Sequence, residues 1–149
     1  MGAYRFRWDV IPANIDFLLS GIGMTLLISA LPRVLATAAG LLIAAMAASR
    51  FWAARAIATG FGEVIRNTPI LVQLLWVYYV LPIVLGIRLD ALTACVIGLS
   101  VYSSAFIAEV FRAGIQAVPA GHREAAQVLG LSPFQSFSRI VAPQAVRTV

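Results

Sequence analysis

Few side chains in this chain of 149 residues could do chemistry, and the polar segment 119–143 holds the densest group of them. Glu124 and His122 lie there, directly after an apolar run. The sequence has no glycine-rich loop with lysine, no nucleophile elbow and no spaced set of metal ligands. We therefore expect no catalytic residue, no cofactor and no metal, and we interpret the segment as a docking element.

The polar segment carries the signals of two short helices joined by a tight turn. Pro119 favours a helix start, and Gly130 is placed to end that helix in the left-handed conformation that other residues resist. Ser132 is a predicted N-cap, and Gln135 three residues later completes a capping box. Pro143 is predicted to end the second helix.

The composition favours a membrane protein. Hydrophobic residues make up 61% of the chain and charged residues 11%, against about 45–50% and about 25% in soluble domains. Three long runs, at about 17–49, 67–87 and 91–108, contain one charge among them, and about 20 helical residues cross a bilayer. We predict an all-α integral membrane protein with three transmembrane helices and a cytoplasmic coupling helix-turn-helix.

The first run contains both a proline and a charge. As one helix, 17–49 would measure about 50 Å, more than the roughly 30 Å of hydrocarbon, so we expect tilt or protrusion into the cytoplasm. Pro32 predicts a kink, or alternatively a division into two re-entrant halves. Arg33 is costly inside a membrane unless it faces protein or water, and the sequence assigns it no role.

The positions of the arginines predict an orientation. All eleven basic residues are arginine, and Arg50, Arg55 and Arg66 lie between the first two spans while four more follow the third. Because positive residues favour the cytoplasmic side, we predict that both segments are cytoplasmic and that the N-terminus and the connection around Arg88 are extracytoplasmic. The arginines form no basic face interleaved with aromatic residues, so we expect membrane lipid and no nucleic acid as partner.

The polar segment resembles the Glu-Ala-Ala loop of ATP-binding cassette (ABC) importer permeases. The matching residues are Gly121, Glu124, Ala125, Ala126, Leu129, Gly130, Ser132 and Pro143. In that family the loop docks the permease on its ATPase, so the resemblance implies a cytoplasmic ATPase dimer that binds the ATP and Mg. His122 departs from the usual glutamine, and we expect a solvated loop residue. An amphipathic hairpin on the lipid surface is the alternative.

A second segment is similar to the polar amino-acid permeases, the histidine, glutamine and arginine type. It consists of Glu63, Arg66, Thr68, Pro69 and Gln73 at the second span. Glu63 and Arg66 are three residues apart and are predicted to pair. Thr68 and Pro69 are predicted as the cap and the first residue of the helix that enters the membrane.

The resemblance implies a function and an assembly. The chain would be a permease subunit in the bacterial cytoplasmic membrane, paired with a second copy or a paralogue. It would receive a polar amino acid from an extracytoplasmic solute-binding protein. A non-transporting membrane scaffold or assembly protein is the alternative, because spans and an amphipathic loop would suffice for it.

The resemblance also bears on completeness and on the solute pathway. Permeases of this type have five spans, so we expect 1–149 to be a single permease domain that is incomplete at its C-terminus. Polar side chains in and near the spans are the pathway candidates, and each could equally serve helix–helix hydrogen bonding. They are Tyr79, Tyr102, Ser103, Ser104 and Glu109.

Overall fold

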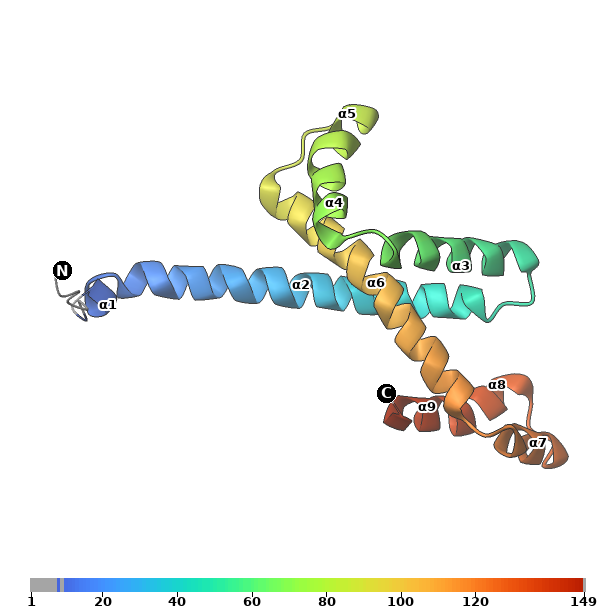
Figure 1. The fold of residues 1–149 in the computed structure, drawn as a ribbon. Coiled ribbons are helices and arrows are strands. Elements are labelled where there is room, and N and C mark those ends of the chain that lie inside the picture. The colour runs from blue at the N-terminus through green and yellow to red at the C-terminus, as the bar shows by residue number, and fades with distance from the viewer. Residues whose placement is uncertain (1–7, 9, 149) are drawn as a thin grey trace, which may run out of the picture.

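The computed structural model describes residues 8 and 10–148, and every regular element within them is a helix. Two long helices cross each other, α2 (Ile15–Ala47) and α6 (Ala91–Ala117), and the shorter helices are arranged around this crossing (Figure 1). A short turn of helix, α1 (Val10–Ala13), precedes α2. Both long helices are long and apolar enough to cross a membrane. The predicted all-α membrane architecture is therefore confirmed.

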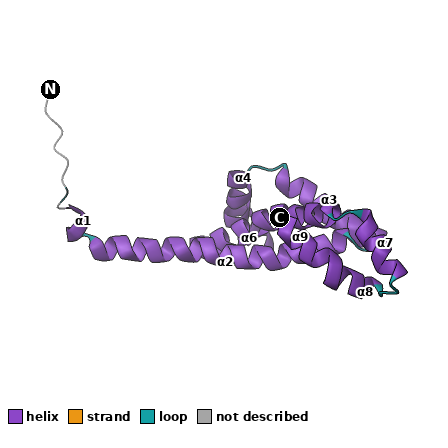
Figure 2. Ribbon diagram, turned by 90° about the horizontal axis from the view of Figure 1, so that it is seen from below, coloured by secondary structure: helices purple, strands orange, loops and turns teal. Residues whose placement is uncertain are grey.

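The first predicted span is a single helix. α2 continues through Pro32, which is buried inside it, so the alternative of two re-entrant halves is wrong. No sharp bend is visible along α2 from either direction (Figures 1 and 2), and the predicted kink is absent. The N-terminal charges Arg5, Arg7 and Asp9 lie outside the described residues.

The second predicted span is shorter than expected. It follows a helix that the sequence analysis did not predict. α3 (Trp52–Arg66) packs antiparallel against the C-terminal half of α2. The chain then turns by 104° into the helical stretch Ile70–Leu85. That stretch comprises α4 (Ile70–Leu75), the π-helical segment η1 (Trp76–Val80) and α5 (Leu81–Leu85). The described chain thus has two membrane-length helices, or three if the bent pair is one broken span.

The third predicted span continues past its expected end at residue 108. Asp90 is the N-cap of α6, and its carboxylate accepts hydrogen bonds from the Thr93 hydroxyl at 2.6 Å and the Thr93 backbone N–H at 3.0 Å. These bonds favour the charged form and lower the pKa of Asp90. The helix runs on to Ala117 because Glu109 and Arg112 end the apolar run without disturbing helical geometry.

Small residues allow α2 and α6 to cross closely. Ala36, Gly40 and Ala44 are buried on α2, and Ala105 and Ala108 on α6. A Cβ added at Gly40 would lie 2.7 Å from Ile107 Cγ2 and 3.0 Å from the Ser104 carbonyl oxygen. Only glycine fits this contact, which is how small residues bring membrane helices together.

The C-terminal helices fold back on the end of α6. They are α7 (Ala120–Val128), α8 (Pro133–Ser136), the π-helical segment η2 (Phe137–Val141) and α9 (Ala142–Thr148). Val118, Val141 and Ala145 form a small buried core with Ile115 beneath them, and this core holds α9 against α6. The prediction that Pro143 ends the second helix is wrong, because the helical path runs from Pro133 to Thr148.

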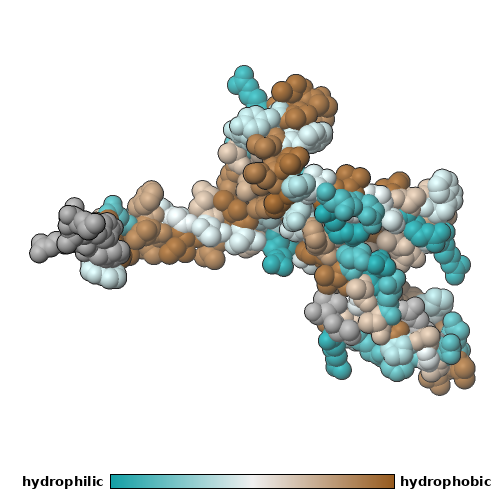
Figure 3. All heavy atoms as spheres, viewed as in Figure 1, coloured by the Kyte–Doolittle hydropathy of each residue, from teal (hydrophilic) through white to brown (hydrophobic). Residues whose placement is uncertain are grey.

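Large apolar side chains lie on the outside of the molecule. They cover much of α2 and the α4–α5 stretch, seen as brown surface in Figure 3. Phe17, Leu71 and Ile83, for example, are 66–82% exposed. An apolar exterior of this extent fits hydrocarbon and not water.

Candidate functional site

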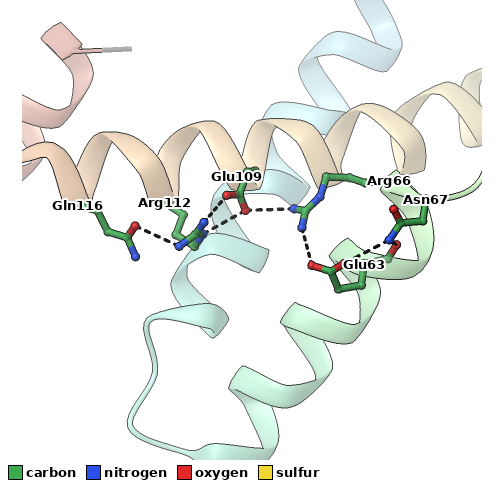
Figure 4. Close-up of polar contacts among 6 residues, drawn as sticks. All are labelled: Glu63, Arg66, Asn67, Glu109, Arg112 and Gln116. Atoms are coloured by element: carbon green, nitrogen blue, oxygen red, sulfur yellow. Dashed lines mark hydrogen bonds and ion pairs between the residues drawn. The ribbon is translucent and has the colours of Figure 1, made fainter.

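A network of charged side chains connects the end of α3 to α6. Arg66 Nη2 donates to Glu63 Oε1 and Arg66 Nη1 donates to Glu109 Oε2, both at 3.1 Å (Figure 4). Glu109 also accepts hydrogen bonds from Arg112, with its Nε at 3.0 Å. The predicted Glu63–Arg66 pair is confirmed. The bridge from Arg66 to Glu109, 43 residues away, was not predicted.

The charges in this network alternate in sign. Two carboxylates and two guanidinium groups neutralise one another, and two amides close the ends: Asn67 donates to Glu63 at 3.2 Å, and Gln116 accepts from Arg112 at 3.1 Å. A cavity of about 200 Å³ lies beside the network and has a wall of alanines from α2, α3 and α6. Neutralised charges of this kind can hold helices together and can separate again, which suits a movable contact.

The second-span motif builds the 104° bend. Helix C-termini leave carbonyl groups without partners, and at the end of α3 side chains supply them. Gln73 Nε2 donates to the Ile65 carbonyl at 2.8 Å, and the Thr68 hydroxyl donates to the Val64 carbonyl at 2.7 Å. Pro69, not Thr68, occupies the N-cap of α4. The predicted helix start is thus shifted by one residue, because Thr68 faces back toward α3.

The turn between α7 and α8 has the predicted geometry. Gly130 has a φ of 70°, and its N–H bonds the Gln127 carbonyl at 2.9 Å while the Leu131 N–H bonds the Ala126 carbonyl at 3.1 Å. This pair of bonds is the Schellman arrangement. Ser132 Oγ and Gln135 exchange hydrogen bonds with each other's backbone N–H, so the capping box is confirmed.

The outer side of α7 is exposed. Ala126 is fully buried and anchors the helix, whereas Glu124 is exposed and makes no hydrogen bond or ion pair with a described side chain. Three apolar side chains surround the turn, with Val128 87%, Leu129 75% and Phe134 78% exposed. The exposed surface of this turn thus combines a carboxylate with no described partner and three large apolar side chains.

His122 connects α7 to α9. Its Nδ1 lies 2.7 Å from Gln144 Oε1, which places a hydrogen bond between α7 and α9 when Nδ1 carries the proton. His122 is exposed, as expected, but it lies in helix α7 and not in a loop. Its contact with Gln144 was not predicted, because the second helix was expected to end at Pro143.

The pathway candidates fall into separate places. Tyr102 and Ser103 are partly exposed and line a groove of about 330 Å³ between α2 and α6. Ser104 is only 2% exposed and donates to the Val101 carbonyl at 2.7 Å. Tyr79 is 59% exposed on the π-helical segment η1, and Glu109 belongs to the charged network. Only Tyr102 and Ser103 share a groove.

Known proteins resemble this chain along nearly all of its length. It is 39% identical over 148 residues to the glutamine transport system permease protein GlnP of Escherichia coli (strain K12), covering 96% of this chain and 66% of that protein. It is 34% identical over 136 residues to the arginine transport system permease protein ArtQ of Bacillus subtilis (strain 168), covering 91% and 62%. The chain thus spans slightly under two thirds of these relatives.

A solved structure and a family profile agree with these relatives. A structure described as an amino acid ABC transporter with histidines matches with a TM-score of 0.89 and 36% identity, over 98% of this chain and 68% of that one. Residues 36–149 match the profile of the "Binding-protein-dependent transport system inner membrane component". The chain therefore belongs to the family of inner-membrane components of binding-protein-dependent transport systems.

Proposed function

We propose that this chain is the membrane-spanning permease subunit of an ATP-driven importer of polar amino acids. The main support is the combination of family membership with a folded helix-turn-helix on which Glu124 is exposed and has no partner among the described side chains. Relatives named for glutamine and arginine transport support the substrate class. The membrane-length helices supply the spans.

The helices α7 to α9, called the coupling segment below, would receive the force of ATP hydrolysis from a separate ATPase dimer, which binds the ATP and Mg. Two contacts support its moving with α6 as one body: the buried core of Val118, Val141 and Ala145, and the hydrogen bond from His122 to Gln144. A rigid element transmits a displacement without absorbing it. A push on α7 would thereby shift α6 against α2 and α3.

The remaining partners follow from the same proposal. A second permease copy or a paralogue would complete the pathway, and an extracytoplasmic solute-binding protein would deliver the amino acid. The arginines near α3 and in the coupling segment support a cytoplasmic location for both and an extracytoplasmic N-terminus.

Uptake by the reconstituted complex tests the proposed function. The chain is combined in proteoliposomes with its ATPase, partner permease and binding protein, and uptake of radiolabelled glutamine, arginine, histidine and glutamate is measured. At least one amino acid should accumulate only with ATP and with the loaded binding protein. A stable complex that transports none of these four amino acids would favour the scaffold alternative.

A charge reversal tests the coupling role of Glu124. Glu124→Lys should abolish co-purification of the ATPase and lower uptake about tenfold or more, because a docked carboxylate pairs with positive or dipolar groups. Glu124→Gln, which keeps the shape and removes only the charge, should have a smaller effect. Full complex formation by the lysine variant, at normal abundance in the membrane, would contradict the coupling role.

A further inference from the structure

Arg33 is a cation near the middle of a membrane-length helix. It is the only charged residue between 17 and 49, and α2 places it roughly 20 Å or more from either helix end. Its guanidinium makes no hydrogen bond or ion pair with a described side chain. A charge inside an apolar helix of membrane-spanning length is costly and normally marks a functional contact. Arg33 also lies outside the matched range 36–149.

Arg33 opens onto the groove between α2 and α6. The groove of about 330 Å³ also receives Tyr102 and Ser103 from α6, and its walls include Leu99, Phe106 and Ile107. Neither Tyr102 nor Ser103 has a side-chain hydrogen bond within the described chain. Two neighbouring hydroxyls do have hydrogen-bond partners: Ser29 donates to the Leu26 carbonyl and Ser104 donates to the Val101 carbonyl. Arg33, Tyr102 and Ser103 thus share one groove, and none of the three side chains has a hydrogen-bond partner among the described residues.

This set of donors matches a carboxylate. A guanidinium presents a planar fork of N–H groups to the two carboxylate oxygens, and two hydroxyls can donate to their remaining lone pairs. The groove lining contains no acidic side chain that could compete. The apolar wall, with the Tyr102 and Phe106 rings 4.8 Å apart, leaves room for the rest of a small solute.

We propose that Arg33, Tyr102 and Ser103 bind the carboxylate group of a small solute within the membrane, with Arg33 as the anchor. This inference rests on the proposed transport function and assigns one step of it to a defined place. The two hydroxyls beside Arg33 favour a solute held inside the groove. A lipid phosphate is an outcome of the test, in which neither calorimetric probe would bind. A concave groove also suits a small solute better than it suits a packed helix.

Uptake per ATP hydrolysed tests the anchor in the complete transporter. The probe is L-glutamine on its binding protein, in proteoliposomes. Arg33→Gln should lower this ratio about tenfold or more, the usual effect of losing a hydrogen bond to a charged group, while binding-protein-stimulated ATP hydrolysis persists. Arg33→Lys should retain part of the uptake. Ser103→Ala should lower it about threefold, and Ser104→Ala, its buried neighbour, should not change it.

A second measurement addresses the carboxylate itself. Calorimetric titration of the purified complex without binding protein compares L-glutamine with L-glutamine α-amide, which lacks the α-carboxylate. The wild type should bind L-glutamine about tenfold more tightly or better, and Arg33→Gln should remove the preference. Equal binding of both probes, or binding of neither, would overturn the inference. The proposed transport function, which is tested by uptake, would not be affected.

Four further outcomes would also overturn it. Wild-type uptake by Arg33→Gln would show that Arg33 faces lipid, and loss of the partner permease from that variant would show a pair with a partner carboxylate. Equal losses in Ser103→Ala and Ser104→Ala would show a packing effect. If the wild-type complex transports no amino acid, the proposed function fails first and the inference fails with it.

Discussion

Glu109 shows how much one carboxylate can connect in a chain with few charges. It lies on α6 and accepts from Arg66 on α3 and from Arg112 on its own helix. Glu63 makes its ion pair only within α3. The two glutamates therefore belong to one network, but only Glu109 links two helices.

Replacing Glu109 should weaken the contact between α3 and α6. Glu109→Gln leaves Arg112 without its carboxylate partner and Arg66 with Glu63 alone. We expect a loss of stability of about 1 kcal/mol, since the Glu109 carboxylate is partly exposed. The measurement is thermal unfolding of the purified protein in detergent. Glu63→Gln is the matched control and should cost less. An equal or larger effect in the control would refute the linking role of Glu109.

Gly130 is required by its backbone conformation. At a φ of 70°, Gly130→Val should strain the turn by about 1–2 kcal/mol and displace α8 relative to α7. The variant should lose most of the ATPase in co-purification while it remains in the membrane. Gly130→Asn, a residue that tolerates this conformation, should bind nearly normally. The idea fails if both variants bind the ATPase like the wild type.

At the scale of elements, prolines and π-helical segments occur together. Pro82 and Pro143 each lie two residues after such a segment, η1 (Trp76–Val80) and η2 (Phe137–Val141). A proline ring collides with the carbonyl four residues earlier in a regular α-helix, and here that carbonyl belongs to the wider π turn. This explains why the helical path continues where a sequence rule predicts a stop.

The crossing of α2 and α6 depends on Gly40. Gly40→Ala should push the helices apart and lower the stability by about 1–3 kcal/mol, because the new Cβ would lie 2.7 Å from Ile107 Cγ2 and 3.0 Å from a backbone oxygen. Thermal unfolding in detergent measures the loss. Gly21→Ala is a control in the same helix, at a position with no atom within 4 Å. Similar unfolding temperatures for Gly40→Ala and the wild type would disprove the close contact.

At the scale of the whole molecule, the orientation in the membrane is a prediction from the arginines. With Cys95 replaced by alanine, a cysteine at Ser132 should resist a membrane-impermeant thiol reagent in intact cells and react after permeabilisation. A cysteine at Arg88, exposed between α5 and α6, should react in both conditions. The reverse labelling pattern would show that the chain is inserted the other way round.

The sequence by itself determined the features that depend on neighbouring residues and on composition. The apolar runs gave the membrane class, and the turn at Gly130 and the capping box at Ser132 were predicted residue by residue. The Glu63–Arg66 pair was predicted from helical spacing. These features are local, because a cap, a turn or a pair three residues apart is fixed by side chains within one or two helical turns.

Only the tertiary structure decided which distant residues meet. The bridge from Arg66 to Glu109, the bond from His122 to Gln144 and the groove shared by Arg33 and Tyr102 all join separate helices. Their positions depend on the angle and register at which α2, α3 and α6 pack. That geometry comes from contacts such as the one at Gly40, and the hydrophobic pattern of one helix does not contain the position of the next.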